Sequence, residues 1–121
     1  SGVIDDVVPD IWEIRIDSEE AYAVIEFIKR GFSVTLADIT RNRYDTESQL
    51  NLVILLYRGK DGELLLPSDK QVLYPRDRLL ICSQRGVRHS MEWALQNQNV
   101  LEFLLTGKTP IQSTLLRKIL N

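Results

Sequence analysis

Two arginines and the only histidine of this 121-residue chain stand close together, at Arg85, Arg88 and His89. They flank Gly86 just before a segment with helical spacing, and the free N–H groups and dipole at a helix start favour a bound anion. The segment lacks the glycine spacing of a phosphate loop or a dinucleotide-binding turn. The sequence therefore predicts either a phosphate seat at residues 84–89 or an ordinary basic turn.

Arg41 and Arg43 form a second basic patch, next to Tyr44. Two cations beside an aromatic ring are residue types that hold anionic ligands, although a mobile polar loop has the same composition. We include both arginines among the candidate ligand-binding residues.

Enzymatic chemistry has little support in the sequence. His89 has no nucleophile or orienting group placed around it, since Ser90 is adjacent in sequence and not poised for attack. One histidine and one cysteine, Cys82, fall short of any zinc pattern. We expect no catalytic residue and no metal site, and the sequence identifies no cofactor.

The composition predicts one domain without disulfides. The formal charge of -2, from 15 basic and 17 acidic residues, gives no reason to expect nucleic acid as a partner. No apolar run approaches the roughly 20 residues that span a bilayer, so we expect a soluble fragment. Ser1-Gly2 reads as a cleavage scar, and we expect a domain excised from a longer protein.

The N-terminal third predicts a strand followed by a helix. We expect a strand over residues 11–16, because Ile14 and Ile16 alternate with Glu13 and Arg15, the period of a half-buried strand. Asp17 and Ser18 then supply helix-capping chemistry, with two glutamates in the expected first turn. We predict a helix of about three turns that ends at Gly31.

The next two segments are less regular. Residues 33–39 are β-branched enough for a strand, but Ser33 or Thr35 could also begin a short helix, and local propensity leaves both open. Residues 41–49 are polar and predict a loop.

Three apolar runs in residues 52–82 predict a β-meander. Asp61-Gly62 lies between the first two, and glycine supplies the positive φ that a tight hairpin turn needs. Pro67 ends the second strand, and a polar turn leads into the third. Cys82, inside that third run, is expected to be a buried small hydrophobe.

From Arg88 onward the apolar spacing becomes helical, with an interruption at residues 97–99 and an end at Gly107. A short helix follows over residues 115–120. We therefore predict an α+β fold with a small antiparallel or mixed sheet and packed helices. Its expected parts are a tail at 1–10, a module at 11–84 and a C-terminal helical extension at 85–121, which docks either on the sheet or on a partner chain.

The strand ending in Arg58, the glycine turn, the strand into Pro67 and the later run Asp77-Arg78-Leu79-Leu80 together resemble the TrkA-C domain. This domain is the C-terminal half of the regulators of potassium conductance. The stretch 31–39 is similar to a helix start in that family, so the resemblance favours a helix there. In the family a glycine precedes the aspartate, and here Arg76 replaces it, which puts the turn geometry in doubt. We interpret Asp77 as structural.

The resemblance implies a cytosolic regulatory domain of a bacterial potassium channel or transporter, acting at the cytoplasmic face of the inner membrane. It implies a homodimer, an effector such as a nucleotide or another small molecule, and transmembrane and nucleotide-binding portions elsewhere in the same protein. A ligand-free assembly module, or a regulatory domain of another ion transporter, remains an alternative. A small enzyme is the least expected.

Overall fold

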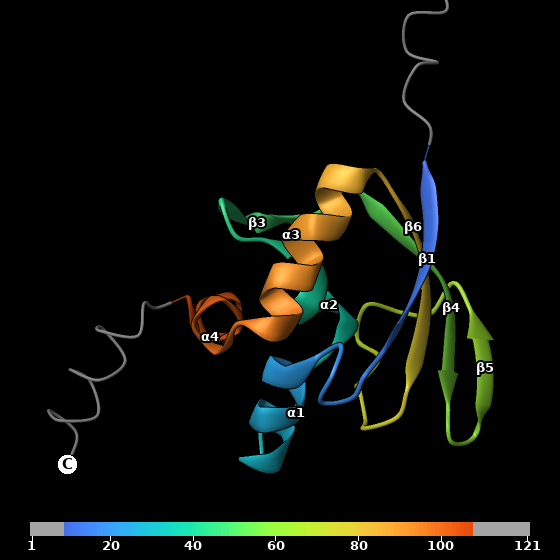
Figure 1. Ribbon diagram of the computed structural model, residues 1–121, viewed down its shortest axis with the longest axis horizontal. Coiled ribbons are helices and arrows are strands. Elements are labelled where there is room, and N and C mark those ends of the chain that lie inside the picture. The colour runs from blue at the N-terminus through green and yellow to red at the C-terminus, as the bar shows by residue number, and fades with distance from the viewer. Residues whose placement is uncertain (1–8, 108–121) are drawn as a thin grey trace, which may run out of the picture.

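The computed structural model describes residues 9–107, which fold as an α+β structure with helices on one side of a four-stranded sheet (Figure 1). The predicted fold class is confirmed. The strands are β1 (Asp10–Arg15), β2 (Arg41–Asn42), β3 (Asp45–Gln49), β4 (Leu52–Gly59), β5 (Gly62–Leu65) and β6 (Arg78–Ser83). The helices are α1 (Tyr22–Lys29), α2 (Leu36–Thr40), α3 (Arg85–Gln96) and α4 (Gln98–Thr106).

The main sheet has the order β1-β6-β4-β5 with every pair antiparallel. The predicted meander is therefore wrong, because β6 pairs with β4 on the side away from β5. The reason is the apolar content of β6. Its residues Leu79 and Ile81 are buried on one face, while Leu80 and Cys82 are half-buried on the other, so a central position covers both faces. β5, exposed along its length, takes the edge.

The hairpin between β4 and β5 is present, but it turns one residue earlier than expected. Gly59 pairs with Gly62, so the loop consists of Lys60 and Asp61, and Gly62 supplies the positive φ of +127°. Gly59 has a separate role. A Cβ there would lie 2.6 Å from the hydroxyl oxygen of Tyr57, so only glycine leaves room for that ring.

Helix α1 begins at Tyr22, several residues later than predicted. Oδ1 of Asp17 accepts hydrogen bonds from the N–H groups of Glu19 (3.0 Å) and Glu20 (2.9 Å), which form a turn before the helix. Asp17 therefore caps this turn and not the helix, because its short side chain reaches only the nearest N–H groups. The end of the segment is as predicted, with Gly31 at φ +92°.

Residues 33–39 contain a short helix, which confirms the reading favoured by the family resemblance. Thr35 and Asp38 form a capping box, in which the Asp38 carboxylate accepts from the Thr35 N–H at 2.8 Å.

The predicted loop at residues 41–49 is wrong, because β2 and β3 pair there as an antiparallel hairpin. Both faces of β3 are largely exposed, so no apolar alternation marks it as a strand.

The interruption predicted at residues 97–99 is confirmed. Asn97 ends α3, and its Oδ1 caps α4 by accepting from the N–H groups of Asn99 (2.9 Å) and Val100 (3.1 Å). α3 begins at Arg85, three residues earlier than the helical spacing suggested. The helix predicted at 115–120 lies outside the described residues.

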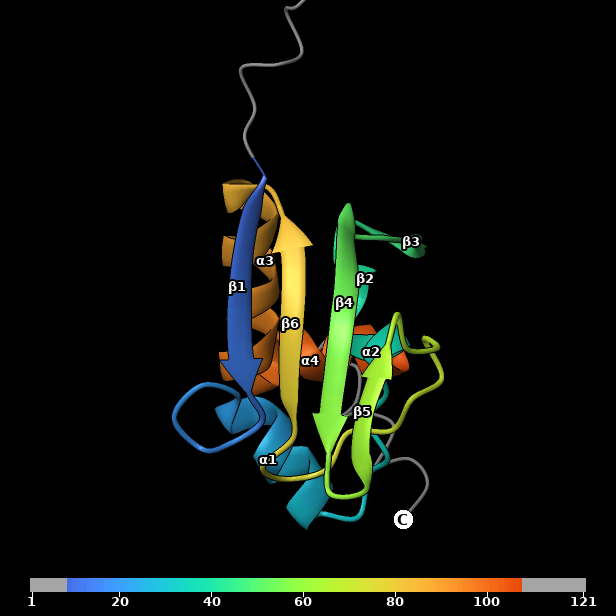
Figure 2. The same ribbon diagram turned by 90° about the vertical axis from the view of Figure 1, so that its right-hand side faces the viewer.

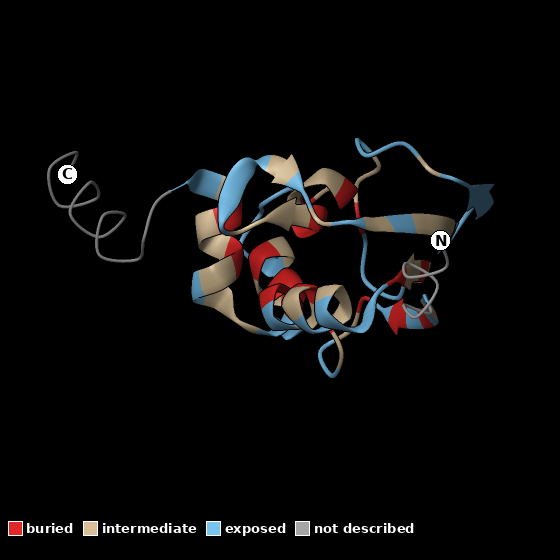
Figure 3. Ribbon diagram, turned by 90° about the horizontal axis from the view of Figure 1, so that it is seen from above, coloured by how far each residue is buried: buried red, intermediate tan, exposed pale blue. Residues whose placement is uncertain are grey.

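One hydrophobic core joins the sheet to all four helices. It contains Ile14 and Ile81 from the sheet together with Met91, Leu95 and Leu101 from α3 and α4. Helices α3 and α4 therefore pack against the sheet of their own chain. The buried residues, red in Figure 3, gather where helices meet one another and the sheet. In the described part of the chain, no helix is long and apolar enough to cross a membrane.

Candidate functional site

The structure places the residues predicted at the start of α3 mainly in structural or surface positions. Arg88 lies 3.2 Å from the carboxylate of Asp10 and 3.5 Å from that of Glu92, and its guanidinium stacks over Trp12 at 5.0 Å. It therefore ties α3 to β1. Arg85 is exposed on the first turn, and exposed His89 has Nδ1 3.8 Å from a Glu92 oxygen. None of these residues lines the cavity beside the β4–β5 hairpin or the one between α2 and the start of β4.

Arg41 and Arg43 make contacts within the fold as well. Arg41 donates to the backbone carbonyl of Leu104 and lies 3.9 Å from the Asp38 carboxylate. Arg43 stacks on the rings of Trp93 (3.8 Å) and Tyr44 (4.7 Å). Its buried Nε is the single buried side-chain nitrogen or oxygen without a hydrogen bond within residues 9–107. Both arginines hold the β2–β3 hairpin against α3 and α4.

A groove of about 920 Å³ lies at the end of the sheet where β4 turns into β5. It runs between the β4–β5 hairpin and the turn that precedes β6, which are neighbours at the lower end of Figure 2. Four basic residues line it: Arg58, Lys60, Arg76 and Arg78. We did not predict this groove, because its two walls are joined only when β6 pairs with β4.

The groove has a rigid polar floor. The Tyr57 hydroxyl donates to Oδ2 of buried Asp77 at 2.6 Å, and the same oxygen accepts from the Tyr74 N–H at 2.8 Å. Burial and the neighbouring carboxylate raise the pKa of Tyr57 well above its ordinary range. The structural role predicted for Asp77 agrees with these contacts.

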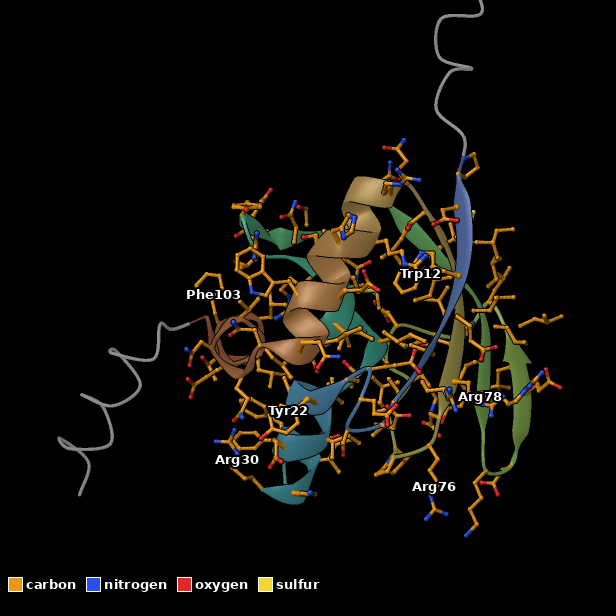
Figure 4. The ribbon with its side chains drawn as sticks, viewed as in Figure 1. Trp12, Tyr22, Arg30, Arg76, Arg78 and Phe103 are labelled. Atoms are coloured by element: carbon orange, nitrogen blue, oxygen red, sulfur yellow. The ribbon has the colours of Figure 1, made fainter. Side chains whose placement is uncertain are left out.

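The turn before β6 has a backbone conformation at Arg76 that glycine adopts more easily than arginine. Arg76 has φ +78°, it follows Pro75, and the Asp77 N–H donates to the Tyr74 carbonyl at 3.1 Å. Proline followed by a residue with positive φ is the arrangement of a type II turn, in which glycine or asparagine is usual. Within residues 9–107 the Arg76 side chain has no ion pair. Figure 4 shows it extending from the lower end of the molecule.

The outer face of the sheet, turned away from the helices, has two chemically different ends. Figure 2 looks onto this face, and no helix lies in front of the strands. The end near the start of β1 is apolar, whereas the end near the groove is charged. The apolar end consists of Ile11, Val53, Leu56, Leu65, Leu80 and Cys82, and the charged end of Arg15, Arg58, Glu63 and Arg78. Glu13 lies opposite Leu80, at the border between the two ends. Cys82 is half-buried here, not fully buried as predicted.

A search of protein-family models found no match to this chain, and searches of curated proteins and of solved structures found no significant match.

Proposed function

We propose that this chain is a cytosolic, non-enzymatic regulatory domain of a potassium channel or transporter and that it works as a dimer. The link to ion transport rests on the resemblance of roughly residues 11–84 to the TrkA-C domain. We infer the dimer from the apolar end of the outer sheet face, which no described helix covers. This surface is the main observation in support of the proposal.

The apolar end of this face exposes several large apolar side chains to solvent. Leu65 is 81% exposed, Ile11 62% and Val53 49%, and they surround half-buried leucines on β4 and β6. Contiguous apolar surface of this kind marks an interaction site more often than scattered single residues do. No described helix covers it (Figure 2).

A second copy of the chain fits this face. Its charged end carries three arginines and Glu63, and Glu13 borders it, so both signs are present. A two-fold axis places the same patch on both partners, which brings apolar ends together and lets opposite charges meet at the rim. The proposal commits to this isologous pairing.

In the proposed assembly the domain lies at the cytoplasmic face of the bacterial inner membrane and belongs to a longer protein with transmembrane and nucleotide-binding portions. Two arrangements of the dimer with different effector affinity would bias the pore between its states.

Sedimentation of the chain tests the dimer. We expect the wild type to sediment as a dimer and Leu65→Glu to sediment as a monomer, since burying a new carboxylate at a two-fold interface is costly. Tyr44→Glu is the matched control, because Tyr44 is 80% exposed, lies on the β2–β3 hairpin and receives the same charge. A wild-type monomer at high concentration would refute the proposed assembly.

A growth assay tests the link to potassium. The full-length protein that contains this chain would be expressed in bacteria lacking their own potassium uptake. We expect Leu65→Glu to change the potassium concentration that growth requires, and Tyr44→Glu to leave it unchanged. An equal response with sodium in place of potassium would instead favour a regulator of another ion transporter.

A ligand-free assembly module is the second candidate. The observation in its favour is that Arg41, Arg43 and Arg88 are engaged in contacts within the fold. A dimer that binds none of a panel of nucleotides and ions, judged by thermal shift, would support this candidate over the ligand-sensing one.

A further inference from the structure

The free edge of β5 exposes unpaired backbone groups beside a run of leucines. We propose that β5 pairs with β5 of a second copy, antiparallel and across a two-fold axis, so that the two four-stranded sheets join edge to edge. The pairing uses the edge of the sheet and is separate from the face-to-face dimer proposed above. Its use in joining such dimers rests on that proposed function.

Two residues of β5 direct their backbone groups toward the free edge. Within residues 9–107, β4 lies on one side of β5 and no strand lies on the other, and Figure 2 shows β5 as the outermost strand. The Leu66 N–H donates to the Leu55 carbonyl of β4 at 3.0 Å. Because hydrogen bonding alternates along an antiparallel pair, Leu64 also faces β4. The N–H and C=O groups of Glu63 and Leu65 therefore point to the free edge.

The side chains of β5 do not protect this edge. Leu64, Leu65 and Leu66 are 49%, 81% and 67% exposed, and Glu63 is the single charged residue of the strand. An exposed apolar edge is a template for pairing with another chain, and natural proteins usually block it with charges, proline or a covering segment. The opposite edge of the sheet has this protection, because half of the residues of β1 are charged. The contrast indicates an edge that receives a partner strand.

A second copy of β5 satisfies the edge in one register. When Glu63 lies opposite Leu65 of the second copy, every outward N–H meets a carbonyl, because the two-fold axis repeats the pair. If Glu63 lay opposite Glu63, two like charges would face each other, which destabilises a sheet. If Leu65 lay opposite Leu65, Glu63 would meet Pro67, which has no N–H to donate. The favoured register sets Leu64 opposite Leu64 of the second copy, so the two exposed leucines cover each other.

Continuity with the outer face also favours a second copy over an unrelated peptide. Leu65 belongs to the apolar end of that face and lies opposite Leu56 of β4. Edge pairing brings Leu65 of both copies to the same side of the joined sheet, so their apolar ends become continuous.

The edge contact is small, because only two residues of each chain direct backbone groups outward. It falls well below the roughly 1,200 Å² of stable interfaces, so the isolated chain should sediment as the face-to-face dimer at ordinary concentrations. Copies tethered in one assembly have effective concentrations of about the millimolar range, at which such weak contacts form.

Disulfide trapping tests the register. Both variants carry Cys82→Ala, which removes the native thiol, and Val53→Glu, which disrupts the face-to-face dimer and lies on β4, away from the free edge. We expect Leu64→Cys to form a disulfide-linked dimer about tenfold faster than Leu65→Cys. The register sets the Cα atoms of residue 64 about 4.5 Å apart, within disulfide range, and those of residue 65 about 8 Å apart. Leu65 is the more exposed, so accessibility alone favours the opposite order.

Hydrogen exchange followed by NMR tests the pairing without an added thiol. In Val53→Glu, the amides of Glu63 and Leu65 should exchange more slowly as the protein concentration rises, because their N–H groups become hydrogen-bonded. The Leu64 amide faces β4 and should show no such dependence. Leu64→Lys should abolish the dependence, since it sets two like charges opposite each other. Tyr44→Lys, which adds the same charge in the β2–β3 turn, should retain it.

The proposal is overturned if residues 64 and 65 form the disulfide at equal rates, or if Tyr44→Lys loses the concentration dependence. Exchange at the Glu63 and Leu65 amides that is equally fast at every concentration would also overturn it and leave the edge to a strand of another protein. Disulfide trapping does not use Leu64→Lys, so unfolding of that variant leaves the test intact. Edge pairing in a wild-type chain that forms no face-to-face dimer would refute the proposed assembly alone.

Discussion

The hydroxyl group of Tyr57 donates a 2.6 Å hydrogen bond to the buried carboxylate of Asp77. Twenty residues separate the two in sequence, and the bond joins the end of β4 to the turn that leads into β6. The same carboxylate oxygen accepts from the Tyr74 N–H, so one side chain organises both walls of the groove. Gly59 is part of this arrangement, since any Cβ there would collide with the Tyr57 ring.

Replacing Tyr57 with phenylalanine should destabilise the fold. The substitution leaves the buried Asp77 carboxylate with one hydrogen bond fewer, which costs about 1–3 kcal/mol. Urea unfolding would measure the loss of free energy. Tyr22→Phe, at an exposed position on α1, is the control and should change stability by less than about 0.5 kcal/mol.

The advantage of wild type over Tyr57→Phe should disappear in alkali. The pKa of Tyr57 is raised above its ordinary value of 10.0 by burial and by Asp77, so the folded chain keeps a proton that the unfolded chain releases. The stabilisation is therefore complete below pH 10 and declines as the pH rises above it. Urea unfolding of both proteins from pH 8 to pH 11 would show the difference shrinking. A constant difference across that range would contradict the assignment.

Arg76→Gly should stabilise the chain by about 0.5–1 kcal/mol. Relief of a left-handed backbone at φ +78° exceeds the extra entropy that glycine brings to the unfolded chain. Thermal unfolding followed by circular dichroism would measure the gain. Arg78→Gly, two residues later at the first position of β6, should instead lower stability, because glycine there relieves no positive φ and adds entropy to the unfolded chain.

Arg88→Gln should lower the free energy of unfolding by about 0.5–1.5 kcal/mol, through loss of the Asp10 pair and of stacking on Trp12. Arg85→Gln removes the same charge from an exposed position and should have no measurable effect. If both variants behave alike in denaturant titrations, Arg88 does not tie α3 to β1 as the structure indicates.

Thr35→Val should lower the free energy of unfolding by about 1 kcal/mol, because it removes the hydroxyl of the capping box. Valine keeps the β-branched shape of the side chain next to Val72, so the hydroxyl is the main change. Hydrogen exchange should show faster opening of α2 than in wild type. Ser33→Ala, which lies before the cap, should leave exchange in α2 unchanged.

Elements governed by neighbours in sequence could be predicted. The helix break at Asn97, the glycine end at Gly31, the hairpin near Gly62 and the α+β class all follow from side chains acting on their own backbone. Errors arose where a local signal was ambiguous. Asp17 is a good cap, but the sequence does not say whether it caps a helix or the turn before it.

Only the tertiary structure decided which surfaces exist. The sequence marked Arg58, Arg76, Asp77 and Arg78 as residues near turns, and it determined their charge. Their meeting at one groove depends on β6 crossing to the far side of β4, because strand order is set by total burial of both sheet faces. Other long-range contacts, of β2 with α4 and of α3 with β1, engaged Arg41 and Arg88 within the fold, at positions where their sequence neighbours had suggested a ligand seat.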